Sequence, residues 1–116
     1  MSKKIAFLFP GQGSQAVGMG KDLYENFESA KNVFDTADKV LEKSITTMCF
    51  EGPEESLKQT VNTQPSIVTM SIAAMEALKS SCDIKPDYAA GHSLGEYCAM
   101  YAAGVMSLET TLKAIQ

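Results

Sequence analysis

The stretch Gly91-His92-Ser93-Leu94-Gly95 decides both the fold and the chemistry expected of this chain. A Gly-x-Ser-x-Gly pattern between a strand and a helix is typical of a nucleophile elbow, in which the serine occupies a tight strand-to-helix turn. The glycines let strand and helix approach too closely for a Cβ, and the serine is expected to adopt strained dihedral angles. We therefore expect Ser93 to take an acyl group in covalent catalysis.

The helix expected after this serine, over 93–103, would direct unpaired N–H groups and the positive end of its dipole at the site. An oxyanion on an acyl carbon attached to Ser93 would meet the backbone N–H of Leu94. One such donor is worth about 10²–10³ in rate. As a bare pattern, Gly-x-Ser-x-Gly is only moderately specific, and the alternative interpretation is a purely structural turn.

The flanking segments predict an α/β domain. The continuous apolar run 5–9, closed by Pro10-Gly11, is typical of a buried strand in a parallel sheet, and 87–90 is a second, weaker strand candidate. Helices are expected over 21–41 with a break at 26–29, 45–50, 53–58, 65–79, 93–103, and from Ser107 to the end of the chain. Pro65 suits a first helical position, Gly104 suits a helix end, and Ser107 suits an N-cap.

The loop Pro10-Gly11-Gln12-Gly13-Ser14-Gln15 follows the first expected strand. It contains no Gly-Lys-Ser/Thr, and its spacing differs from the dinucleotide-binding fingerprint, so a phosphate-binding role is not supported. Loops at the carboxyl ends of parallel strands build the site in such sheets. The N–H of Gln12 is therefore a candidate second oxyanion donor.

His92 is the only histidine in the chain. A hydrogen bond between its ring and the hydroxyl of the adjacent Ser93 would have poor geometry, because neighbouring side chains diverge across such an elbow. We expect His92 to line or shape the pocket. A serine nucleophile still requires a base, and no other histidine is present to supply one.

Composition excludes several classes of function. The 116 residues suffice for one domain, the net charge is −4, and no basic cluster exceeds the pair Lys3-Lys4, which argues against nucleic acid and anionic membranes as partners. No apolar run reaches the length of a signal-peptide core or a membrane span, so a soluble, cytoplasmic protein is expected. Cys49, Cys82 and Cys98 form no metal-binding pattern. We expect reduced, mostly buried thiols, and neither metal nor cofactor.

Three stretches together resemble the N-terminal signatures of malonyl-CoA:acyl carrier protein transacylases of the stand-alone bacterial type. They are Phe9-Pro10-Gly11-Gln12-Gly13-Ser14-Gln15, Thr63-Gln64-Pro65-Ser66 and Gly91-His92-Ser93-Leu94-Gly95-Glu96-Tyr97. The stretch Ala102-Ala103-Gly104 also fits. The motifs follow the order and separations of this family, and the acyltransferase domains of fatty-acid and polyketide synthases share them.

The resemblance implies a three-layer, parallel-sheet, α/β-hydrolase-like fold: the large subdomain of an acyltransferase. It also implies a ping-pong reaction of fatty-acid biosynthesis, in which Ser93 takes the malonyl group from malonyl-CoA as an ester and releases it to the phosphopantetheine thiol of acyl carrier protein. Gln12 and Leu94 would form the oxyanion hole through their backbone N–H groups. His92, Gln64 and Gly11 would line the substrate pocket.

The chain also departs from the family. The general-base histidine and the arginine that pairs with the malonyl carboxylate lie beyond Gln116, and the ferredoxin-like small subdomain is missing. We therefore expect 1–116 to be the N-terminal part of the large subdomain, cut within the helix that begins near residue 108. The isolated chain should be inactive, and marginally stable or oligomerising. A further expected partner is the remainder of the same enzyme as another chain.

Two other classes of function remain open. A serine esterase or thioesterase on a related scaffold would carry an oxyanion loop of the His-Gly-Gly-Gly kind, whereas this chain has Gly11-Gln12-Gly13-Ser14-Gln15. A non-enzymatic binding or regulatory fragment would keep the elbow without the base.

Overall fold

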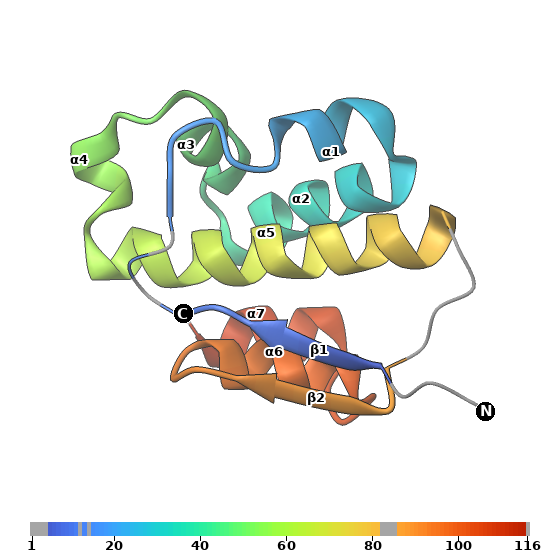
Figure 1. Cartoon of the computed structure of the whole chain (residues 1–116). Helices are drawn as coiled ribbons and strands as arrows, with labels where there is room; N and C mark the ends of the chain where they lie inside the picture. The colour runs from blue at the N-terminus through green and yellow to red at the C-terminus, as the bar shows by residue number, and fades with distance from the viewer. Residues whose placement is uncertain (1–4, 12, 14, 82–85, 116) are drawn as a thin grey trace.

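The computed structural model describes residues 5–11, 13, 15–81 and 86–115. Two strands and seven helices follow one another in these residues (Figure 1). They are β1 (Ala6–Phe9), α1 (Lys21–Asn26), α2 (Glu28–Leu41), α3 (Ile45–Glu51), α4 (Glu54–Leu57), α5 (Thr60–Ser81), β2 (Tyr88–Gly91), α6 (Gly95–Ala102) and α7 (Leu108–Ala114). The expected α/β class is confirmed.

The two strands pair in parallel, with Ala6 opposite Tyr88 and Phe9 opposite Gly91. In Figure 1 the long helix α5 crosses the middle of the molecule, with α1–α4 on one side and the sheet with α6 and α7 on the other. Helix α6 packs against both strands. The carboxyl ends of the strands therefore meet at one edge, where the two candidate loops begin.

Most of the core lies between α2 and α5. Helix α2 is amphipathic and buries Val33, Phe34 and Leu41, among others, on one face at helical spacing. The ring of Phe34 lies 5.9 Å from that of Tyr24 and 5.1 Å from that of Phe50, measured between centroids. These contacts hold α1 and α3 against α2. Helix α5 packs against all three of these helices.

Helix α5 confirms one expectation and corrects another. It is buried on most sides, as the apolar sequence predicts. Its start at Pro65 was wrong, because the helix begins five residues earlier, at Thr60. Pro65 cannot donate to the carbonyl of Val61, and the Nζ of Lys43 donates to that oxygen instead, at 3.2 Å. This bond from the α2–α3 connection gives the Val61 carbonyl a donor in place of the one that proline lacks.

The expected burial of the first strand was also wrong. Only Phe9 is buried in β1, and Leu8 is 77% exposed. In the part of the chain that the structure describes, the sheet has two strands, and the face bearing Ala6, Leu8, Tyr88 and Ala90 has no helix packed against it. A continuous apolar run predicts a strand with other elements packed on both faces of its sheet. The described residues cover only one of these faces.

The remaining boundaries follow the local sequence signals. Phe27 has an extended backbone between α1 and α2, at the expected break. The hydroxyl of Ser107 accepts a hydrogen bond from the N–H of Thr110, at 3.2 Å, and so caps α7. Across the described residues we find no helix with the length and hydropathy of a membrane span.

Candidate active site

Ser93 lies on a strained turn between β2 and α6. Its φ is 53°, in the left-handed region, and Glu42 is the only other described non-glycine residue with positive φ. A residue with positive φ cannot be part of a right-handed helix, so α6 begins at Gly95 and not at Ser93 as expected. The side chain of Ser93 is exposed at the carboxyl end of β2. Exposure and strain together confirm the backbone geometry expected of a nucleophile elbow.

Two glycines allow this turn to close. A Cβ at Gly91 would lie 2.0 Å from the carbonyl carbon and oxygen of Gly95, and a Cβ at Gly95 would lie 2.4 Å from the carbonyl oxygen of Phe9. Real Cβ atoms do not approach so closely, so β2, the start of α6 and the end of β1 meet here only because both residues lack one. The two motif glycines therefore serve close backbone approach.

The first loop reaches the elbow through Gly11. A Cβ on this buried residue would lie 2.6 Å from the carbonyl oxygen of His92 and 3.0 Å from its Nδ1. The N–H of His92 also donates to the carbonyl of Phe9, at 3.1 Å. The structure thus brings together the two loops that the parallel-strand argument placed side by side. Gln12 and Ser14 lie outside the described residues.

The backbone N–H of Leu94 is available to a ligand. The following amides of Gly95, Glu96 and Tyr97 donate to the carbonyls of residues 92, 93 and 94, at 3.0–3.2 Å. In the described part of the chain, no acceptor takes the N–H of Leu94 itself. Its side chain is buried, so its amide is held firmly beside Ser93. An amide without an acceptor at the start of a helix can donate to a ligand, so the oxyanion role expected of Leu94 stays a prediction.

In the part of the chain that the structure describes, no side chain forms a hydrogen bond with the hydroxyl of Ser93. His92 is exposed, and its ring makes no hydrogen bond to any residue that the structure describes. Gln64 is half-buried on α5, and no hydrogen bond joins its amide to the described part of the elbow. The pocket role expected of these two residues therefore stays a prediction.

The buried thiols are poor nucleophiles. Burial raises the pKa of Cys49 to about 11 and that of Cys98 to about 12, from an ordinary value of 9.0. Both cysteines are free and buried, which confirms the expected burial of these two, whereas Cys82 lies outside the described residues. No group of three or more potential metal ligands occurs among the residues with described positions. The nucleophile role expected of Ser93 stays a prediction.

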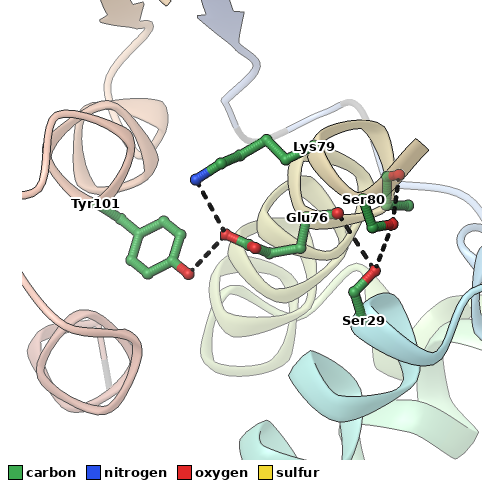
Figure 2. A network of polar contacts seen from close by, with 6 residues as sticks. Ser29, Glu76, Lys79, Ser80 and Tyr101 are labelled. Atoms are coloured by element: carbon green, nitrogen blue, oxygen red, sulfur yellow. Dashed lines mark hydrogen bonds and ion pairs between the residues drawn. The ribbon is translucent and has the colours of Figure 1, made fainter. Parts of the chain in front are cut away.

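A polar cluster beneath the elbow helix was not predicted from the sequence. Figure 2 shows Tyr101 of α6 pointing to Glu76 of α5, with Lys79, Ser80 and Ser29 nearby. The hydroxyl of Tyr101 donates to Oε1 of Glu76 at 2.9 Å. The two residues lie 25 positions apart on separate helices, and no motif joins them, so only the packing of α6 on α5 reveals the pair.

Comparison with known proteins shows that this chain is similar to acyl transferases. A family model described as an acyl transferase domain matches residues 6–116. The malonyl CoA-acyl carrier protein transacylase of Bacillus subtilis (strain 168) is 52% identical over 113 residues, which cover 97% of this chain and 35% of that protein. The corresponding protein of Staphylococcus aureus (strain N315) is 42% identical over 113 residues, covering 97% of this chain and 36% of its own length.

Solved structures give the same result. The crystal structure of the malonyl CoA-acyl carrier protein transacylase from Clostridium perfringens matches with a TM-score of 0.92 and 40% identity, over 97% of this chain and 35% of that one. A malonyl-transacylase in complex with a type II polyketide acyl-carrier protein matches with a TM-score of 0.91 and 36% identity, over 97% and 37% of the two chains. The chain therefore spans about a third of the length of these relatives.

Proposed function

Because the chain belongs to the acyl transferase domain family, we propose that it carries the nucleophile of a malonyl-CoA:acyl carrier protein transacylase of fatty-acid biosynthesis. The observation that carries this proposal is Ser93, exposed at φ 53° on a turn closed by Gly91 and Gly95. The curated relatives bear the name of this activity. The cytoplasm is the proposed location.

In the proposed first half-reaction, Oγ of Ser93 attacks the thioester carbonyl of malonyl-CoA and loses its proton to a base. The negative charge then forms on the carbonyl oxygen, where the N–H groups of Leu94 and Gln12 would stabilise it. Collapse of this intermediate breaks the carbon–sulfur bond, and the CoA sulfur leaves with a proton. Ser93 is left as a malonyl ester.

The second half-reaction reverses these steps with another thiol. The phosphopantetheine sulfur of acyl carrier protein attacks the ester, the same N–H groups stabilise the oxyanion, and Oγ of Ser93 leaves and regains its proton. His92, Gln64 and Gly11 would line the pocket around the acyl group. Gly11 fits this role because its backbone lies against His92.

We further propose that residues 1–116 form the N-terminal part of the large acyltransferase subdomain, cut within the helix that contains α7. The general base, the arginine for the malonyl carboxylate and the ferredoxin-like subdomain would belong to the remaining part, and the isolated chain would be inactive. The match to about a third of each relative supports this division.

The remaining part of such an enzyme would have a suitable place to dock, whether as another chain or in the same one. A groove of about 410 Å³ runs between β1 and α5, and none of its lining residues is charged. They are Ala6, Phe7, Leu8, Phe9, Pro10, Met70, Ser71, Ala74, Met75 and Leu78. Covering this apolar surface would remove it from water, which favours association.

The test compares the chain alone with the chain supplemented by the rest of a relative. The chain is incubated with malonyl-CoA, alone and with the segment of the Bacillus subtilis protein that lies beyond the matched third, and intact mass and peptide mapping follow the acyl group. We expect malonylated Ser93 and transfer to acyl carrier protein only in the mixture, with Ser93→Ala as the inactive control.

Two results would overturn the proposal. Rapid labelling of Ser93 in the chain alone would contradict the missing base. Hydrolysis of the thioester without transfer to acyl carrier protein would favour the esterase or thioesterase alternative.

A further inference from the structure

Glu76 links the elbow helix to the central helix. Its Oε1 accepts a hydrogen bond from the hydroxyl of Tyr101, at 2.9 Å, and lies 4.0 Å from Nζ of Lys79 (Figure 2). The Glu76 side chain is 25% exposed. A charge-assisted bond in such a half-buried position is stronger than one between neutral groups, and it directs the Tyr101 ring toward α5.

The same turn of α5 is tied to α2 on its other side. The hydroxyl of Ser29 donates to the main-chain carbonyl of Glu76, at 3.2 Å, and lies 3.1 Å from the hydroxyl of Ser80. Helices α2, α5 and α6 are therefore joined at one level of the molecule. Glu76, which binds Tyr101 of α6, is thus part-buried and lies on a turn that is also bonded to α2.

Helix α6 has few other polar attachments. At its start, Gly95 packs against the carbonyl of Phe9. At its middle, the Cys98 thiol donates to the carbonyl of Val68 over 3.9 Å, which is a weak bond. Burial and the bond to Glu76 raise the pKa of Tyr101, so its hydroxyl stays a donor further into the alkaline range than that of an ordinary tyrosine. In the described residues, the bond to Glu76 is thus the shorter of the two side-chain hydrogen bonds that α6 donates to α5.

We propose that Glu76 and Tyr101 are positioning residues that set the orientation of α6, and through it the alignment of Ser93 and the Leu94 N–H. The proposal rests on the proposed acyl-transfer function. Packing on both strands holds α6 through contacts that are not directional. The bond of Tyr101, about two turns beyond Gly95, adds a directional restraint against rotation of the helix. Alignment matters because a displacement of about 1 Å in a site can lower the rate 10²-fold.

Hydrogen exchange of the chain itself tests the positioning role without any acyl transfer. In Tyr101→Phe we expect the hydrogen-bonded amides among residues 94–103 to exchange about tenfold faster, while those of α2 keep their rates. Glu76→Gln retains an oxygen acceptor for Tyr101 but not the charge, so exchange in this segment should stay closer to that of the unsubstituted chain than in Tyr101→Phe. Ser29→Ala is the matched control, since it breaks the α2 side of the same cluster and should leave residues 94–103 unchanged.

The kinetic test uses the chain mixed with the remaining segment of the Bacillus subtilis relative. Tyr101→Phe should lower kcat about three- to tenfold with KM for malonyl-CoA unchanged, and Glu76→Gln and Ser29→Ala should retain activity. Unchanged exchange at residues 94–103 in Tyr101→Phe, or equal acceleration in Ser29→Ala, would overturn the positioning role. Absence of transfer by the unsubstituted mixture would count against the proposed function, and the exchange result would still decide the role of the pair.

Discussion

Ser93 adopts a backbone conformation that costs a residue with a Cβ about 1–3 kcal/mol. The close backbone contacts of Gly91, Gly95 and Gly11 hold Ser93 in this conformation. The strain lowers the free energy of unfolding, and the hydroxyl is exposed in return. This makes the position unusual in its response to substitution. A residue that relaxes the strain should stabilise the fold while it removes the reactive group.

We expect Ser93→Gly to be more stable than Ser93→Ala by about 1 kcal/mol, because glycine adopts positive φ without a steric cost. Urea unfolding followed by circular dichroism measures the difference. Asn32, exposed on α2, is the control site: there the alanine variant should be the more stable, by about 1 kcal/mol. The same order at both sites would contradict the strained elbow.

The buried thiols make the stability depend on pH in the alkaline range. Burial raises the pKa of Cys98 to about 12 in the folded chain, against 9.0 when exposed. Between these values the unfolded chain has lost a proton that the folded chain retains, so the free energy of unfolding falls as pH rises above about 9. Urea unfolding from pH 7.5 to 10.5 should show this fall, and Cys98→Ala should make it shallower. Equal slopes in the two proteins would contradict burial of the thiol.

At the scale of the elements, α5 depends on a bond from outside itself. The Val61 carbonyl, which Pro65 cannot engage, accepts from Lys43 of the α2–α3 connection. The bond supports the turn that contains Gln64. A lysine that replaces a missing backbone donor is expected to contribute a measurable part of the stability of this turn.

We predict that Lys43→Met lowers the free energy of unfolding by about 0.5–1.5 kcal/mol and speeds amide exchange in 60–65. The methionine keeps the apolar stem of lysine, so the measured loss reports the missing hydrogen bond to the Val61 carbonyl and not lost packing. Lys43→Arg should recover most of the loss. Lys21→Met is the control, since in the described residues the Lys21 ammonium has no hydrogen-bond or ion-pair partner. A comparable loss in Lys21→Met would show that charge alone matters.

The sequence predicted those elements whose signals are local. The break at Phe27, the cap at Ser107 and the turn at Ser93 each depend on residues within a few positions of one another. The start of α5 could not be predicted, because the donor at Lys43 lies 18 positions from Val61. Bonds across such separations follow from packing, and packing leaves no local pattern in the sequence.

In the candidate site, too, some contacts could be predicted from the sequence and others depend on packing. The contact between Gly11 and His92 could be predicted, because loops at the carboxyl ends of paired parallel strands must be neighbours. The bond between Tyr101 and Glu76 could not, since it depends on how α6 rotates about its own axis. The bare face of β1 also escaped prediction, because an apolar run does not reveal which residues cover it.

For the whole molecule, the uncovered sheet face should drive association. Leu8 is 77% exposed beside Tyr88 and Ala90, an apolar surface of the kind that pairs with another chain. We expect Leu8→Lys to shift the chain toward monomer in sedimentation velocity without lowering the free energy of unfolding of that monomer. Val105→Lys, at a residue 70% exposed in the α6–α7 turn, should leave association unchanged. Equal effects of both variants would argue against a specific role of the sheet face.

The pairing of β1 with β2 also has a consequence for the order of folding. The N–H of Ile5 donates to the carboxylate of Asp87, 82 positions away, and α1 to α5 lie between them. Contacts at such separations form late, because the intervening chain must first become compact. Helices α2 to α5 can assemble from nearby residues, whereas Gly95 meets Phe9 only after the strands align. We therefore expect the strained turn at Ser93 to be completed late in folding, when the carboxyl end of β1 reaches the start of α6.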